Sequence, residues 1–201
     1  MGKIEGHTLL FVITPTYFAL SFFHIILALS ALVCMGPPFY LAYRDQKKTW
    51  CRSICPRADF LQKIGRISRR KSAPKWMVGN KARRAVLGYF CMNFLFVTMS
   101  TIAVATGRVE PIEKIRLLIV LELPWNLPQL ISVHALPAWV SHLSYRFYSI
   151  ILTSTLIGVG LALRYKPRTW CAVCPVSTMT GNMIRNLERT GRSSEINSRA
   201  S

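Results

Sequence analysis

The sequence is short of acidic residues and, over long stretches, of charge of either sign. It has 8 Asp and Glu against 26 Lys and Arg, a formal net charge of +18, and yet 51% of its 201 residues are hydrophobic and the mean hydropathy is +0.30. An ordinary soluble domain rarely combines these properties. Apolar and basic residues must therefore occupy separate segments of the chain.

Charged residues are missing from three segments that are long enough, or nearly so, to cross a bilayer as helices. These are residues 6–43, 85–107 and 147–163. A helix needs about 20 apolar residues to cross the hydrocarbon core. We therefore expect an all-α integral membrane protein that forms a single membrane domain over residues 1–201. Its three transmembrane helices are predicted at about 17–43, 85–107 and 147–164, after a leading interfacial segment.

The basic residues predict the orientation of these helices. Residues 44–84 contain 14 Lys and Arg, and the stretch from Arg164 to the end contains 7. Because loops rich in Lys and Arg stay in the cytoplasm, residues 44–84 and 165–201 are predicted to be cytoplasmic and residues 108–146 external. The expected topology has the N-terminus outside and the C-terminus inside, in the inner membrane of a prokaryote.

Two segments outside the spans have patterns of their own. From Ala58 to Arg70, apolar residues recur at helical spacing opposite basic ones, which predicts an amphipathic helix on anionic headgroups. Prolines interrupt the apolar segment 108–146, which favours an external interfacial segment over a fourth span. Membrane lipid is thus the expected partner of the basic residues. A nucleic-acid surface and a cleaved signal peptide are the competing interpretations, and both are disfavoured by the long uncharged runs.

An internal repeat contains four of the six cysteines of the sequence. Residues 41–51 and 161–171 align without a gap at an offset of 120 positions, and six of the eleven residues are identical, including Thr-Trp-Cys at the end of each copy. Each copy then reaches a second cysteine followed by proline, as Cys-Arg-Ser-Ile-Cys-Pro in the first and Cys-Ala-Val-Cys-Pro in the second. Both copies leave a predicted span on the same side of the membrane. The two cysteine pairs can therefore meet.

Two cysteine pairs at this spacing supply the four sulfurs that one iron-sulfur cluster or one zinc ion requires. The predicted ligands are Cys51, Cys55, Cys171 and Cys174, because a reducing cytoplasm opposes disulfides. Lysines and arginines crowd both motifs and suit an anionic [4Fe-4S] cluster, although they also suit topology determination alone. Residues flanking the ligands are expected to shield or stiffen the site, namely Trp50, Trp170, Pro56 and Pro175.

The remaining cysteines and histidines have weaker signals. Cys34 and Cys91 lie alone within spans and are expected to be packing residues. Embedded histidines are candidate haem ligands or quinone hydrogen-bond partners, but the sequence has no HxxxH pair that supports a haem. His134 and His142, in the predicted external segment, are therefore candidates to lie near a quinone.

With its paired TWCxxxCP and TWCxxCP motifs, the sequence resembles membrane iron-sulfur proteins of the NapH-type polyferredoxin and NosR-type regulator family, without their soluble ferredoxin module. The resemblance implies that Cys51, Cys55, Cys171 and Cys174 share one [4Fe-4S] cluster. It also implies a non-catalytic electron-transfer subunit of an oxidoreductase complex, which relays electrons between the quinone pool and a partner haem or iron-sulfur protein. A zinc-binding scaffold or maturation factor and a cluster-based redox sensor are the alternatives.

Overall fold

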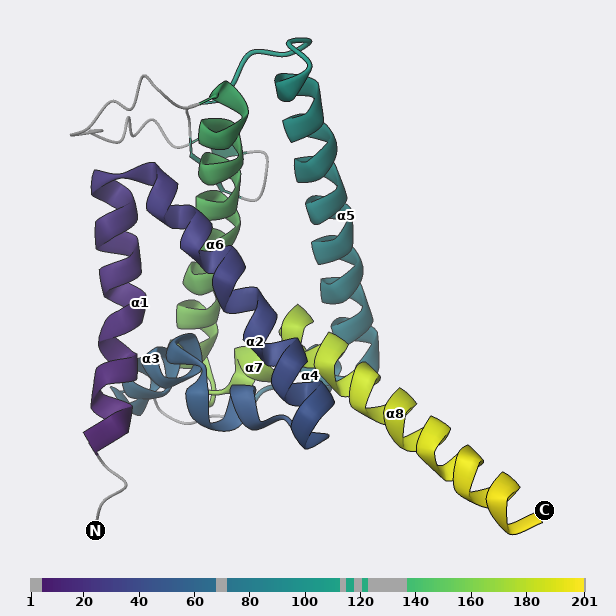
Figure 1. Ribbon diagram of the computed structural model, residues 1–201. Coiled ribbons are helices and arrows are strands. Elements are labelled where there is room, and N and C mark those ends of the chain that lie inside the picture. Colours follow the sequence, from purple (N-terminus) through teal and green to yellow (C-terminus); the bar gives the residue numbers. More distant parts are fainter. Residues whose placement is uncertain (1–4, 68–71, 113–114, 118–120, 123–136, 201) are drawn as a thin grey trace.

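The computed structural model describes residues 5–67, 72–112, 115–117, 121–122 and 137–200 (Figure 1). Within these ranges the regular secondary structure is helical except for two-residue strands β1 (Arg116–Leu117) and β2 (Leu121–Glu122), which pair in antiparallel register. Three helical segments are long and apolar enough to cross a membrane, namely Ile25–Asp45, α5 (Asn80–Ala105) and α6 (Ala138–Arg164). The predicted number of such helices is confirmed, but their bounds differ from those expected.

The N-terminal uncharged run forms two antiparallel helical segments. One straight helix over its 38 residues would be about 57 Å long, nearly twice the thickness of the hydrocarbon core. Instead, α1 (Glu5–Phe23) ends at His24, whose backbone is extended, and the 3-10 turn η1 (Ile25–Leu29) leads into α2 (Ser30–Asp45) (Figure 1). The predicted single span over residues 17–43 is therefore wrong in its first part.

This hairpin also changes the expected position of the N-terminal segment. We call the end of the fold that contains residues 50–55 and 169–174 the motif end. At this end, Phe11 of α1 stacks on Phe60 of α3 (Pro56–Ile64) with 5.6 Å between ring centroids. The start of α1 therefore lies at the motif end, whereas the sequence predicted an N-terminus on the opposite side.

Helix α6 begins nine residues before the predicted span, so part of the segment expected to be external is helical. Its first turns include His142, which is fully buried between neighbouring segments. The ring of His142 forms hydrogen bonds with Ser100 Oγ (2.6 Å) and with the backbone N–H of Ile112 (3.1 Å). Because protein groups satisfy these polar atoms, the helix extends further than hydropathy alone predicted.

The predicted amphipathic helix over 58–70 is present as α3 and the short turn η3 (Gly65–Ile67), with residues 68–70 outside the described part of the chain, and protein covers Phe60 and Leu61 of its apolar face. Leu61 is fully buried in a cluster with Ala162 of α6 and with Trp170 of α7 (Thr169–Val173). A Cβ added at Gly158 would lie 3.2 Å from Leu61 Cδ1 and 3.5 Å from Trp170 Cγ. The small residues of α6 thus allow α3 and α7 to pack closely against it, rather than another membrane-spanning helix.

The outward faces of the long helices are apolar. On α5, the exposed fractions of Met92, Leu95 and Met99 are 63%, 60% and 60%. Such a stripe would expose a large apolar area to water, whereas hydrocarbon accommodates it without that cost. The described surface therefore agrees with a protein that lies in a membrane.

Three short or peripheral helices complete the motif end. The π-helical turn η2 (Trp50–Ile54) follows α2, α4 (Lys75–Val78) precedes α5, and α8 (Pro175–Ala200) follows α7. Helix α8 begins beside α2 and α5 and extends away from the other helices (Figure 1). The motif end is thus built by segments from both halves of the chain.

The close approach at Gly158 can be tested by substitution. We expect Gly158→Leu to destabilise the protein by about 1–3 kcal/mol, because the added side chain must displace Leu61 or Trp170. Gly160→Leu is the matched control, since nothing lies within 4 Å of a Cβ at that position. Thermal unfolding in detergent micelles checks this, and equal unfolding midpoints for the two variants would contradict the packing.

Candidate metal centre

The two cysteine motifs have the same local structure. In the first, η2 ends at Cys55 and Pro56 begins α3; in the second, α7 ends at Cys174 and Pro175 begins α8. Both second cysteines have an extended backbone, with φ −67° and ψ 111° for Cys55 and φ −54° and ψ 131° for Cys174. Proline suits the first position of a helix because its missing N–H would have no partner within the helix. The repeat in sequence is therefore also a repeat in structure.

The extra residue of the first motif is absorbed by a π-helical turn. The N–H of Cys174 donates to the carbonyl of Trp170, four residues earlier, at 2.9 Å. The N–H of Cys55 donates to the carbonyl of Trp50, five residues earlier, also at 2.9 Å. Each second cysteine is thus anchored to the tryptophan that precedes the first cysteine. The CxxxC and CxxC spacings consequently end in the same geometry.

The four thiols lie close enough to influence one another. Electrostatic interactions connect Cys51 with Cys55 and Cys174, Cys55 with Cys174, and Cys171 with the other three. These interactions cover every pair among the four residues, all of which are partly buried. The structure thus brings both predicted pairs to one place, although they are 120 positions apart in sequence.

Burial and mutual repulsion both oppose the charged thiolates. Burial raises the pKa of the Cys171 thiol to about 12, with the neighbouring cysteines adding to the shift. Burial also raises the pKa of Cys51 and Cys55, while hydrogen bonds from Ser177 to Cys51 and from the Ala58 backbone to Cys55 act in the other direction. Four thiolates could therefore coexist here only beside compensating positive charge.

Contacts between the two motif segments fix their relative position. Arg168, just before α7, donates to the Gln62 side chain at 3.1 Å and to the backbone carbonyl of Arg52 at 3.3 Å. Arg83 at the start of α5 donates to the carbonyl of Ala172 at 2.9 Å. Gly65 lies so close to Pro167 that an added Cβ would be 2.7 Å from a proline side-chain atom. Several segments therefore hold the two motifs together.

Arg57 provides positive charge at the centre of this arrangement. Its guanidinium interacts electrostatically with Cys55, Cys171 and Cys174, and burial lowers its pKa. The guanidinium carbon lies 5.5 Å from the centroid of the Trp170 ring. Its Nε and Nη2 atoms are buried and have no hydrogen-bond partner within the part of the chain that the structure describes. Sequence reasoning counted Arg57 among several basic residues near the motifs, and only the fold distinguishes it.

The flanking tryptophans differ in their surroundings. Trp170 is 9% exposed and belongs to the cluster around Leu61, so it separates the second motif from the helix core. Trp50 is only partly buried. The expectation that both residues shield sulfur therefore has stronger structural support for Trp170 than for Trp50.

The other candidates lie elsewhere. His134 is outside the described residues, and His142 is held by Ser100 and Ile112 in the half of α6 away from the cysteines. Cys34 and Cys91 are exposed on α2 and α5, so the expectation that they pack inside the protein is wrong. A single sequence cannot show which face of an apolar helix turns inward when both faces are apolar.

The donor set suits an anionic four-thiolate cluster. Four partly buried thiols converge, and beside them lies a guanidinium whose Nε and Nη2 have no hydrogen-bond partner among the described residues. Within the described residues no group of three or more His, Cys, Asp or Glu side chains is spaced to hold a single metal ion.

Comparisons with known proteins add no assignment. No family model, curated protein sequence or solved structure matches the chain. Functional inference therefore rests on the residues and their arrangement.

The shared site predicts a common response to mutations in either motif. Cys51→Ser and Cys171→Ser should each abolish binding of the same metal centre, because each removes one of four ligands from one site. Iron, zinc and acid-labile sulfide measured on anaerobically purified protein check this. Cys91→Ser is the matched control on an exposed helix face and should keep the full metal content. Retention of the full content in either motif variant would show that the pairs serve separate sites.

Proposed function

We propose that this protein is an iron-sulfur electron-transfer subunit of a membrane oxidoreductase complex. One [4Fe-4S] cluster would be held by Cys51, Cys55, Cys171 and Cys174 at the motif end. The cluster would relay electrons between the quinone pool and a partner redox protein that carries a haem or another cluster. The resemblance to NapH-type and NosR-type membrane proteins supports the same role.

The observation that carries this proposal is the buried guanidinium among converging thiols. A cluster with four thiolates has a net charge of about −2 when oxidised and one more negative charge when reduced. Arg57 supplies a permanent positive charge beside three of the thiols, and its N–H donors lack partners within the described chain. Burying an unpaired guanidinium is costly, so an anionic centre next to it gives a reason for its position.

The proposed orientation places the motif end in the cytoplasm. Residues 44–84 and 165–201 carry 20 of the 26 Lys and Arg, and the motif segments η2, α3, α7 and α8 belong to these stretches. The inner membrane of a prokaryote fits a cluster that would face a reducing compartment. The start of α1 lies at the motif end and would then face the same compartment.

The proposed relay would transfer electrons one at a time. Oxidation of one hydroquinone releases two electrons and two protons, whereas a [4Fe-4S] cluster carries one electron at a time. Two successive one-electron transfers to the partner redox protein therefore accompany each quinone formed, and the two protons pass to water. The reverse direction has the same stoichiometry. Because one cluster cannot cover the roughly 30 Å of the hydrocarbon core, the protein would work within a larger complex.

Metal analysis tests the cluster against a zinc site. Protein purified without oxygen should contain about four iron atoms and four acid-labile sulfides per chain, and it should give the electron paramagnetic resonance signal of a reduced cluster after dithionite treatment. One zinc ion without sulfide would instead indicate a structural site and eliminate the relay.

The charge of Arg57 predicts a shift in reduction potential. Arg57→Gln should lower the midpoint potential by on the order of 100 mV, because the reduced cluster loses a nearby positive charge in a partly buried site. Arg57→Lys should retain most of the potential, and Arg44→Gln is a control at an exposed position on α2. A redox titration followed by the cluster signal measures all three variants. An unchanged potential in Arg57→Gln, with the cluster intact, would remove Arg57 from the site.

A further inference from the structure

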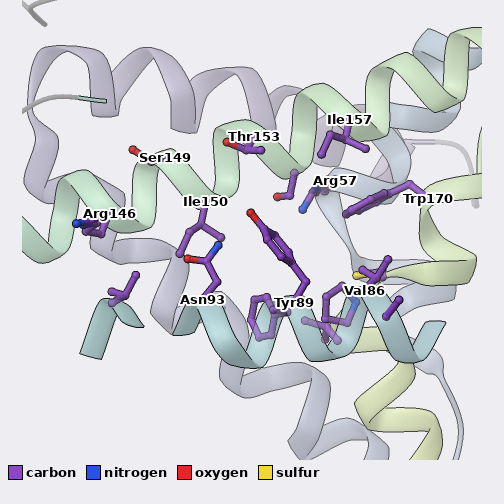
Figure 2. Close-up of a pocket in the computed structure, with 17 residues that line it drawn as sticks. Arg57, Val86, Tyr89, Asn93, Arg146, Ser149, Ile150, Thr153, Ile157 and Trp170 are labelled. Carbon is purple, nitrogen blue, oxygen red and sulfur yellow. The ribbon is translucent and has the colours of Figure 1, made fainter. Parts of the chain in front are cut away.

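A cavity of about 500 Å³ lies between α5 and α6 and reaches the second cysteine motif (Figure 2). Its walls are mostly apolar, with Val86 and Val97 of α5 and Ile150 and Ile157 of α6 among the lining residues. Cys174 and Pro175 line the motif end of the cavity, and Arg146 lines its other end. One ligand of the proposed cluster thus forms part of the wall of a chamber between two membrane-spanning helices.

Several hydrogen-bond donors on this cavity lack partners. The buried atoms Thr153 Oγ1, Trp170 Nε1 and Arg57 Nε and Nη2 have no hydrogen-bond partner among the described residues, and all three side chains line the cavity. Tyr89 adds a hydroxyl that points from α5 into the cavity (Figure 2). Buried donors without partners each cost about 1–3 kcal/mol, so a ligand with acceptor oxygens would be stabilised here.

The donors lie at two levels along α6. Trp170 contacts α6 at Gly158, five positions after Thr153, which is about 7.5 Å along a helix axis. The cavity therefore has hydrogen-bond donors at two different levels along α6, so a ligand with an acceptor at each end could use both. Ile157 lies between these two levels of α6 and Ile150 lies just before Thr153, and both would contact a ring held in the cavity.

The cavity is also accessible from the side. Tyr89 and Ile157 line it from opposite helices, and their exposed fractions are 41% and 39%. In a membrane, this opening between α5 and α6 would face hydrocarbon rather than water. A ligand would therefore enter from the lipid phase.

We propose that this cavity binds the ring of a lipid-soluble quinone, with one carbonyl near Thr153 and Tyr89 and the other near Trp170 and Arg57. This inference rests on the proposed electron relay and gives it a location for the quinone, next to Cys174. A benzoquinone or naphthoquinone ring fits a chamber of this volume, which lies in the usual range for small-molecule sites. The binding site thus lies between the spans near the motif end, rather than at His134 or His142.

Photolabelling and equilibrium binding test this site directly. The protein with its cluster is placed in nanodiscs of phosphatidylethanolamine and phosphatidylglycerol, and an azido-benzoquinone and decylubiquinone serve as probes. We expect the azido probe to label peptides containing residues 85–97 and 146–157, and decylubiquinone to compete with it. Labelling confined to other segments would overturn the assignment. So would displacement of the probe by added phospholipid, which would identify the cavity as a lipid site.

Two pairs of variants distinguish the contribution of a Thr153 hydrogen bond from that of the space in the cavity. Thr153→Val should weaken decylubiquinone binding roughly threefold to tenfold through loss of one donor, while Thr98→Val, on a side chain that bonds to its own helix, should leave it unchanged. Ile150→Trp should fill the cavity and abolish binding, while Leu156→Trp, at a 51% exposed position of α6, should not. Unchanged binding in both cavity variants would disprove the site.

Measuring the cluster signal in the same samples distinguishes the two proposals. A complete cluster without quinone binding would overturn only the quinone site. Quinone binding without iron and sulfide would overturn the proposed relay and leave the cavity assignment in place.

Discussion

The motif end depends on the burial of four thiols and one cation close together. Four thiols and the guanidinium of Arg57 share a partly buried space, where unpaired charge is expensive. The thiolates repel one another, and the guanidinium has no hydrogen-bond partner in the described chain. A cluster whose irons bind the sulfurs, and whose net negative charge attracts the arginine, would satisfy both requirements at once.

Packing on α6 makes that convergence possible. Gly158 and Ala162 leave space for Leu61 and Trp170, so α3 and α7 approach the same helix from both motifs. The π-helical turn at Trp50 then compensates for the extra residue in the first cysteine pair. Because each second cysteine is held by the preceding tryptophan carbonyl, two unequal spacings present their sulfurs in equivalent ways. A small local difference in helix type thus preserves the twofold repeat.

The cavity between α5 and α6 lies beside the motif end, between two helices that are long and apolar enough to cross a membrane. Its unpaired donors, Thr153, Trp170 and Arg57, lie on the route from the lipid phase to Cys174. Arg57 faces both the thiols and the cavity, so one charge could favour both the reduced cluster and the bound carbonyl.

The sequence by itself determined the number of helices that are long and apolar enough to cross a membrane and which cysteines are paired by spacing, because uncharged runs and repeated spacings are local properties. It did not determine that the N-terminal run folds back at His24, that α6 starts at Ala138, or that protein covers Leu61. It also did not separate Arg57 from its basic neighbours or reveal the cavity. Those features depend on which helix faces meet, and in an apolar sequence only tertiary packing decides which faces are buried.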